Sequence, residues 1–258
     1  MRLKVFFRGV NSVVVLPIHY NSLVQAFIYK NLDEWLATKL HDEGFKDPTS
    51  KRSIKFFTFS RLISINNRIK IREKHAIFHG EICLVVASPY NEFIQSFGSN
   101  LLKKNKFEIG NEIFELVSIE VEPTPEYAEK VLVKTISPIT VYSTVLTLDG
   151  KKKIYYYSPF EEDFEKLLLK NLQRKARIWF GKDIYGGSIK PFKVTKKDEK
   201  ILLHHGNLVK GWDGIFELSL PPELFQLAFE AGLGAKNSSG FGCIEIFGRN
   251  NLKKKVLS

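Results

Sequence analysis

Apolar and polar positions change their period several times along the chain, which predicts a mixture of strands and helices. Residues 2–10 alternate between the two kinds, as in a half-buried strand, whereas residues 20–30 carry apolar side chains at a helical spacing. Further strands and a second helix follow before residue 122. The second half repeats this order, with a long helix predicted at 161–179 and a shorter one at 222–231. Both halves therefore approximate the order βαββαβ.

A short segment separates the two halves. Pro123 and Pro125 oppose both a helix and a central strand, so residues 123–128 are predicted as a linker. The chain has 258 residues and 44% hydrophobic side chains, enough for two cores. We therefore expect an α+β protein with two tandem ferredoxin-like (RRM-like) domains, at 1–122 and 129–258.

Local patterns refine this prediction in four places. Residues 31–33 interrupt the first helix, and Asp33 can begin a second helical piece at 34–41, which Gly44 then ends. Residues 55–60 and 200–208 are each predicted as one strand. The neighbours His204 and His205 should then point to opposite faces of a sheet.

The charge balance narrows the class of partner. Lysine and arginine number 39 against 28 acidic residues, giving a net charge of +11. Such a surplus favours nucleic acid or an anionic membrane surface over acidic small molecules. Since no apolar run approaches the ~20 residues of a membrane span, and the N-terminus is too interrupted for a signal peptide, we expect no membrane partner. Cys83 and Cys243 lie in apolar runs, which favours buried thiols in a reducing cytoplasm.

Ligands for a metal are not apparent in the sequence. The six histidines and two cysteines form no cluster at metal-ligand spacing, so neither a metal site nor a cofactor is expected.

The most informative motif is a glycine-rich loop at 232–242, between the last predicted helix and the last predicted strand. Its four glycines allow positive φ and close approach to a ligand, and Lys236 suits a polyanion. The spacing does not match Gly-x-Gly-x-x-Gly, and a phosphate-loop Gly-Lys-Ser/Thr is missing. A plain turn remains the alternative.

This loop, together with residues 26–29, 36–41, 55–60 and 137–139, resembles a known family. The stretches are similar to the archaeal-type CRISPR repeat-processing endoribonucleases of the RAMP superfamily, and the similarity spans nearly the whole chain. The resemblance implies cleavage of precursor CRISPR RNA within each repeat, without metal, leaving 2′,3′-cyclic phosphate and 5′-hydroxyl ends. It also implies that the catalytic residues are Tyr29, His41 and Lys55.

Cleavage by the RNA's own 2′-hydroxyl requires a base, an acid and a cation near the phosphate. Histidine, with an ordinary pKa of about 6.5, can serve as acid or base near neutrality, and lysine can stabilise the transition-state charge. Tyrosine, with an ordinary pKa of about 10, is a poor free base, so Tyr29 either needs activation or orients the 2′-hydroxyl. The direction of proton transfer by His41 stays open. Each residue also has a structural alternative: a half-buried tyrosine, a histidine at a helix end and a solvated lysine.

The predicted RNA-binding residues are glycine-loop residues and basic side chains of the second half. The basic side chains lie on the long helix and on a predicted β-hairpin at 190–200, and they are expected to contact RNA phosphates. Lys175 belongs to the group on the long helix. The residues nominated for RNA binding are Gly232, Gly234, Lys236, Asn237, Ser238, Gly240, Gly242, Arg174, Arg177, Lys190 and Lys193.

The implied partners are CRISPR repeat RNA, precursor CRISPR RNA and a CRISPR effector complex, with the protein either a monomer or a homodimer. Two other functions compete with catalysis. One is a non-catalytic CRISPR RNA-binding subunit of the same superfamily. The other is a general RNA-recognition module, for which the aromatic stretch at 56–59 is the only candidate base platform.

Overall fold

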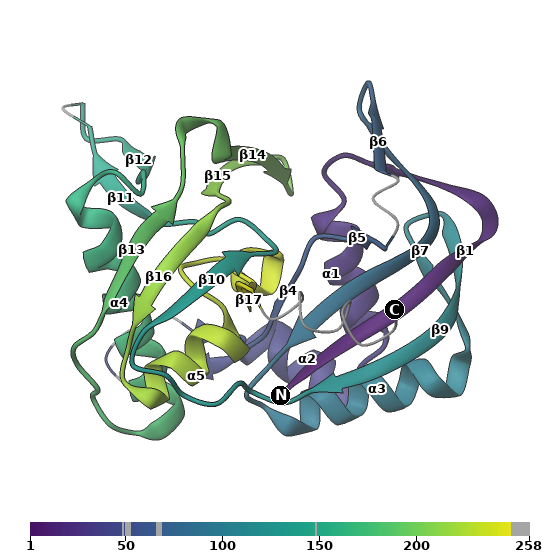
Figure 1. Cartoon of the computed structure of the whole chain (residues 1–258), viewed down its shortest axis with the longest axis horizontal. Coiled ribbons are helices and arrows are strands. Elements are labelled where there is room, and N and C mark those ends of the chain that lie inside the picture. Colours follow the sequence, from purple (N-terminus) through teal and green to yellow (C-terminus); the bar gives the residue numbers. More distant parts are fainter. Residues whose placement is uncertain (48, 50–52, 66–68, 148, 249–258) are drawn as a thin grey trace.

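The computed structural model describes residues 1–47, 49, 53–65, 69–147 and 149–248. The described chain forms two halves that lie side by side, each built on an antiparallel sheet (Figure 1). None of the helices in this part of the chain is long and apolar enough to cross a membrane.

The first half is built around β1 (Arg2–Pro17). This strand lies between β7 (His75–Ala87) and β9 (Glu112–Glu122), and it is antiparallel to both. Helices α1 (Asn21–Lys30) and α3 (Asn91–Lys104) follow β1 and β7 in the chain. The remaining strands of this sheet pair with β7 or β9, and they are β4 (Thr58–Phe59), β5 (Ile63–Ser64), β6 (Ile69–Arg72) and β8 (Lys106–Ile109).

The second half repeats the arrangement around β10 (Val131–Thr135). This strand lies between β16 (Ile215–Ser219) and β17 (Ile244–Ile246), and β13 (Ser188–Lys193) pairs with the outer edge of β16. Its helices are α4 (Glu162–Phe180) and α5 (Pro222–Ala231). Two inserted hairpins complete it: β11 (Tyr142–Leu146) with β12 (Lys152–Tyr156), and β14 (Glu199–His204) with β15 (Asn207–Trp212).

Both sheets thus have the strand order and connections of the ferredoxin-like fold, and the predicted α+β class of two tandem domains is confirmed. Residues 123–130 contain neither helix nor strand. The exact domain boundaries stay a prediction, and residues 249–258 of the predicted second domain lie outside the described residues.

Each half has its own apolar core. In the first, alternate residues of β1 (Leu3, Val5 and Phe7) pack with the helical stripe that includes Val24 and Ile28. In the second, Leu168, Leu172 and Ala176 follow a spacing of four along α4. The buried residues therefore recur at the spacings that the sequence predicts for these strands and helices.

Phe56 and Phe57 are neighbours in the chain but belong to different cores. Phe57 stacks on Phe93 at 4.9 Å in the first core, whereas the Phe56 ring lies 5.0 Å from Trp179 in the second. The backbone takes φ +44° at Phe56 to allow this. The predicted strand at 55–60 is accordingly wrong over its first part, since only Thr58–Phe59 pairs with β7.

Three further predictions need correction. The segment at 200–208 is a hairpin, because the chain turns at His205 (φ +47°) and Gly206. The rings of His204 and His205 consequently lie 4.3 Å apart and do not point to opposite faces. The lysines of 190–200 do not share one hairpin either, since β13 pairs with β16 and β14 with β15.

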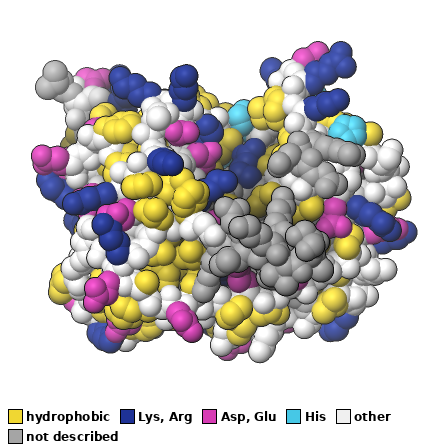
Figure 2. All heavy atoms as spheres, viewed as in Figure 1, with side chains coloured by type: hydrophobic (Ala, Val, Ile, Leu, Met, Phe, Trp, Pro, Cys, Tyr) yellow, Lys and Arg dark blue, Asp and Glu magenta, His cyan; other side chains and the backbone are white. Residues whose placement is uncertain are grey.

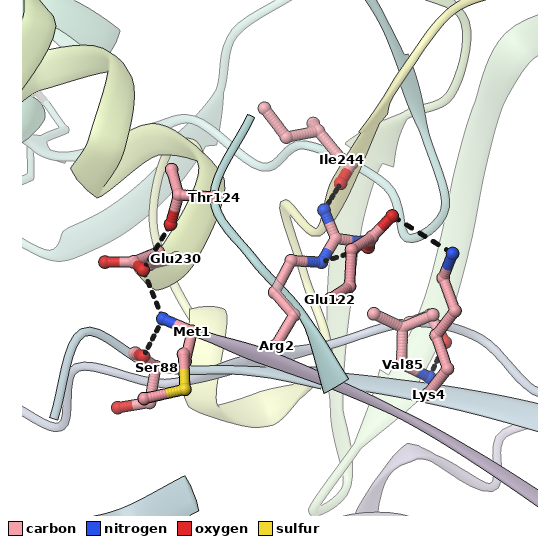
Figure 3. A network of polar contacts seen from close by, with 10 residues as sticks. Met1, Arg2, Lys4, Val85, Ser88, Glu122, Thr124, Glu230 and Ile244 are labelled. Atoms are coloured by element: carbon pink, nitrogen blue, oxygen red, sulfur yellow. Dashed lines mark hydrogen bonds and ion pairs between the residues drawn. The ribbon is translucent and has the colours of Figure 1, made fainter. Parts of the chain in front are cut away.

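An interdomain network joins β1 to the second half (Figure 3). The Arg2 guanidinium is buried; it donates a 2.7 Å hydrogen bond to the carbonyl oxygen of Ile244 and lies 3.3 Å from a Glu122 carboxylate oxygen. Its carbon Cζ is 4.1 Å from the centroid of the Phe229 ring. The α-amino group of Met1 contacts Glu230 on α5. These contacts join the start of β1 to α5 and β17 of the second half.

The two cysteines come together at the same joint. Cys83 and Cys243 are free and buried in one small apolar cluster with Val85. The predicted burial of both thiols is confirmed.

Candidate active site

One face of α1 meets the glycine-rich loop of the second half. Asn21 Nδ2 donates to the carbonyl oxygens of Ser239 (2.9 Å) and Gly240 (3.1 Å), and Gln25 Nε2 donates to that of Ser238 (2.6 Å). Tyr29 is the next residue on this stripe, because positions four apart share a helix face. The loop is therefore docked beside the tyrosine that the sequence nominated for catalysis.

A buried ammonium organises the loop from its other side. Lys175 Nζ, from α4, donates to the carbonyl oxygen of Gly232 (2.6 Å) and to Asn237 Oδ1 (2.8 Å). The Asn237 amide in turn donates to the carbonyl oxygens of Leu233 and Phe241, both at 3.0 Å. Complete burial lowers the pKa of Lys175 to about 7. Lys175 was expected to contact phosphate, and it instead fills the inside of the loop.

Close packing explains the glycines at the end of this loop. A Cβ on Gly242 would lie 1.9 Å from the carbonyl oxygen of Leu233, and one on Gly240 would lie 2.5 Å from Phe59 Cε2. Both residues also have positive φ, at +74° and +81°. Gly232, Gly234, Gly240 and Gly242 are all buried. Direct RNA contact by loop residues stays a prediction, for which Lys236 and Ser238 are the more accessible members.

The three nominated catalytic side chains lie together. The rings of Tyr29 and His41 are 5.9 Å apart between centroids, in an edge-on arrangement. Lys55 Nζ lies 5.5 Å from the centre of the Tyr29 ring and donates a 3.2 Å hydrogen bond to the carbonyl oxygen of His41. Residues spread over 27 positions of sequence thus form one cluster at the surface.

The path of the chain between α1 and Lys55 makes this cluster possible. A continuous helix would place Tyr29 and His41 about 120° apart around its axis. Instead the helix breaks after Lys30, restarts as α2 (Glu34–Thr38) and ends in a π-helical turn, η1 (Lys39–Glu43). Gly44, at φ +61°, then lets the chain leave toward β2 (Phe45–Lys46), which pairs with β3 (Ser53–Ile54) just before Lys55. The predicted break and the stop at Gly44 are confirmed, whereas the helix predicted at 34–41 changes type before His41.

The three side chains have different surroundings. The Tyr29 hydroxyl is buried and has no hydrogen-bond partner among the described residues, and burial raises the pKa of this phenol. Partial burial also lowers the pKa of the Lys55 ammonium. His41 is 71% exposed, with Nδ1 at 2.6 Å from Asp42 Oδ1. With Nδ1 engaged, Nε2 is the ring nitrogen that can exchange a proton with a substrate.

This arrangement can support acid–base chemistry at a phosphodiester. It combines an exposed imidazole, an ammonium and a hydroxyl that lacks a protein partner. The Tyr29 phenol stays protonated at neutral pH, so it can donate a hydrogen bond but cannot act as a ready base. No group of three or more His, Cys, Asp or Glu side chains that could hold a metal ion occurs in the described ranges.

The remaining predicted RNA-binding residues are spread over the second half. Arg174 and Arg177 lie on α4, where Arg177 Nε is 2.7 Å from Asp183 Oδ1 and Nη1 is 3.0 Å from Thr49 Oγ1. Lys190 and Lys193 are exposed on β13. Lys236 Nζ lies 5.5 Å from the centre of the Tyr142 ring. The structure thus places Lys236 of the loop beside the β11–β12 hairpin and leaves the β13 lysines on a separate strand.

Sequence reasoning missed three residues that build the site: Asn21, Gln25 and Lys175. The first two could have been found, because they precede Tyr29 at intervals of four on a predicted helix. Lys175 could have been found in a similar way, because it follows Leu168 by seven positions and Leu172 by three on the apolar stripe of the predicted long helix.

Two ferredoxin-like halves, with a glycine-rich loop of the second docked on α1 of the first, define the class of fold. A structure titled "An RAMP protein binding different RNA substrates" shares this fold with a TM-score of 0.80 at 22% identity, over 95% of this chain and 99% of the other. The chain belongs to the Cas6 family: the model "CRISPR-associated protein Cas6, N-terminal" matches residues 15–120, and "CRISPR associated protein Cas6, C-terminal" matches residues 121–246.

Relatives with sequence similarity agree with this assignment. The chain is 28% identical over 251 residues to CRISPR-associated endoribonuclease Cas6 1 of Methanocaldococcus jannaschii, covering 96% of this chain and 93% of that protein. It is 25% identical over 248 residues to CRISPR-associated endoribonuclease Cas6 of Pyrococcus furiosus, covering 93% and 86%. A solved structure titled "CRISPR associated protein Cas6" matches with a TM-score of 0.78 at 26% identity, over 95% and 98% of the two chains.

Proposed function

We propose that this protein is a CRISPR-associated endoribonuclease that cuts precursor CRISPR RNA within its repeats. The observation that carries the proposal is the cluster of Tyr29, His41 and Lys55 beside the docked glycine-rich loop. These are the residue types that metal-independent RNA cleavage needs, and the chain's named relatives are endoribonucleases.

In the proposed reaction, the 2′-hydroxyl oxygen of the RNA attacks the adjacent phosphorus. A bond forms between O2′ and phosphorus, and the bond between phosphorus and O5′ breaks. The proton of the 2′-hydroxyl leaves to a base, and the O5′ leaving group takes up a proton. The products carry a 2′,3′-cyclic phosphate and a 5′-hydroxyl, and the reaction consumes no water.

Each residue of the cluster has a defined part in this step. His41 transfers a proton, since its ring is exposed and Nδ1 is held near Asp42. Lys55 stabilises the negative charge that grows on the phosphate oxygens. The protonated Tyr29 hydroxyl donates a hydrogen bond that orients the 2′-hydroxyl or a phosphate oxygen.

Basic side chains supply the electrostatic part of RNA binding. Figure 2 shows lysines and arginines along the upper rim of one face and in the hollow between the two halves. With a net charge of +11, such a surface favours a polyanion. We assign phosphate contacts to Lys236, Arg174, Arg177, Lys190 and Lys193, and backbone approach to the glycine-rich loop. A cytoplasmic monomer or homodimer that delivers its product to a CRISPR effector complex fits this proposal.

Cleavage of a repeat RNA in excess EDTA tests the proposal directly. We expect cleavage to proceed at the rate seen without EDTA, and sequencing of the ends should show a cyclic phosphate and a 5′-hydroxyl. A single 2′-deoxy substitution at the scissile nucleotide should abolish the cut. Cleavage of the deoxy substrate would contradict the mechanism, while binding without any cleavage would favour the non-catalytic RNA-binding subunit.

A further inference from the structure

A groove of about 700 Å³ lies between α4 and the β11–β12 hairpin, apart from the catalytic cluster. Lys170, Asn171, Arg174 and Arg177 line it from the helix, Tyr142 lines it from the hairpin, and the glycine-rich loop contributes Gly234. Its volume falls within the roughly 300–1,000 Å³ of pockets that take small molecules.

The charge of the groove suits a phosphate. Among the described lining residues, Lys170, Arg174 and Arg177 accompany one acidic residue, Asp47, and Arg177 also pairs with Asp183 at 2.7 Å outside the groove lining. Lys170 is exposed and makes no ion pair with any residue that the structure describes. Cations on one helix face, one or two turns apart, can contact neighbouring phosphates of an RNA strand.

The groove also contains a side-chain oxygen that lacks a hydrogen-bond donor among the described residues. The side-chain oxygen of Asn171 is buried and has no hydrogen-bond partner in the described part of the chain. A buried acceptor without a donor is unfavourable, so a ligand N–H would stabilise this arrangement. Nucleobases carry such groups on their edges, and an asparagine amide can read a base edge because it offers both donor and acceptor.

Helix α4, which lines the groove, also packs against the segments that hold the catalytic cluster. Trp179, near the end of α4, packs against Phe45 at 5.5 Å and Phe56 at 5.0 Å. Phe56 directly follows Lys55, and Phe45 follows the turn that carries His41. The helix that lines the groove is thus packed, through its core side, against the segments that carry the cluster.

We propose that this groove binds one nucleotide of the single-stranded part of the RNA substrate, with Lys170 and Arg174 on its phosphate and Asn171 on its base. The inference rests on the proposed function for the identity of the substrate. It adds a base-reading residue and a position where the protein selects among RNA sequences.

Two lysines on α4 provide a matched test of the phosphate contact. Lys170 lines the groove, whereas Lys166 is one turn earlier, outside the groove, and pairs with Glu162 at 3.3 Å. Fluorescence anisotropy with a labelled repeat RNA at several salt concentrations would give the affinity of each variant. Lys170→Ala should reduce the slope of log K against log salt by about one contact, and Lys166→Ala should leave it unchanged. Equal slopes for the two variants would overturn the proposal.

A second experiment tests the base contact. Asn171→Ala should weaken binding about two- to tenfold without changing the salt slope, because it removes a hydrogen bond and no charge. The same measurement is then made with a series of repeat RNAs, each with one abasic nucleotide. At one position, loss of the base should weaken binding to wild type by the factor seen for Asn171→Ala with intact RNA. At that position, loss of the base should not weaken binding to Asn171→Ala any further. If the affinity losses from Asn171→Ala and from the abasic nucleotide multiply at every position, Asn171 contacts no base.

Free nucleotides share this chemistry, so AMP serves as the competing probe. AMP at millimolar concentration should displace the labelled RNA only weakly. Strong binding of AMP that depends on Asn171, together with unchanged RNA affinity for both groove variants, would assign the groove to a free nucleotide and overturn the RNA proposal. All these measurements report binding, so they remain decisive even if wild type fails to cleave, the outcome that would reject the proposed function alone.

Discussion

The side-chain amide of Gln25 donates a 2.6 Å hydrogen bond to the carbonyl oxygen of Ser238, a residue 213 positions further along the chain. Gln25 lies one helical turn before Tyr29, so the contact joins the glycine-rich loop of one half to the helix of the other half that carries the proposed catalytic tyrosine. The packing between the halves therefore bears on the helix that positions Tyr29, and we expect a disturbed loop to change the cleavage rate even where the loop does not contact RNA.

Removing the imidazole of His41 is expected to stop catalysis and to leave binding in place. Positioned acid–base groups contribute about 10²–10⁴-fold in rate, so His41→Ala should slow single-turnover cleavage by at least about that much. The ring is exposed, so the protein should fold normally, and repeat-RNA affinity should stay within a few-fold. His75→Ala, at an exposed site in the first half, is the control. Normal cleavage by His41→Ala would refute the assignment.

Tyr29→Phe separates the hydroxyl from the ring. Phenylalanine keeps the contacts with Phe57 and His41, so stability should change little. Because burial raises the pKa of the phenol, the hydroxyl stays protonated from about pH 5 to pH 9. The cleavage rate should fall by about tenfold or more, and by the same factor at each pH in that range. If the cleavage rate of Tyr29→Phe no longer depends on pH where that of wild type does, Tyr29 acts instead as the base.

A methyl group on Gly240 should disturb the joint between the loop and the first half. Gly240→Ala introduces a Cβ 2.5 Å from the Phe59 ring and 2.7 Å from Asn21 Nδ2. We expect a loss of about 1–3 kcal/mol in the free energy of unfolding beyond the cost of the positive φ, and slower cleavage. Gly150→Ala is the matched control, because Gly150 also has positive φ (+77°) but no atom within 4 Å of the added Cβ. Chemical denaturation of both variants makes the comparison, and equal losses would reject tight packing as the reason for Gly240.

The buried lysine predicts how stability depends on pH. Burial lowers the pKa of Lys175 to about 7 from an ordinary value near 10.5, so the unfolded chain binds more protons than the folded one between these values. The free energy of unfolding should therefore rise between pH 7 and pH 9, by on the order of 2 kcal/mol from this group. Lys175→Met removes the titrating amine, and its stability should lack this rise. If the free energy of unfolding depends on pH in the same way for wild type and Lys175→Met, Lys175 keeps its proton throughout this pH range.

Much of the fold follows from local patterns in the sequence. The order of strands and helices, the break at 31–33, the stop at Gly44 and the buried cysteines could all be predicted, because side-chain period and turn chemistry act over a few residues. The nominated trio and the glycine-rich loop were likewise visible as residue types in a recognisable order.

Only the tertiary structure decided how these parts meet. Lys175 follows Leu168 and Leu172 on the buried stripe of α4, but only the tertiary structure brings the carbonyl oxygen of Gly232 and the side chain of Asn237 to its amine. Phe56 leaves the expected strand because the core of the other half offers its ring a contact with Trp179. The sequence by itself determined most of the elements and the reactive groups, whereas packing between segments distant in the chain decided which side chains lie together. Burial and hydrogen bonds such as those of Lys175 with Asn237, 62 positions apart, and of Gln25 with Ser238, 213 positions apart, arise only in the folded chain.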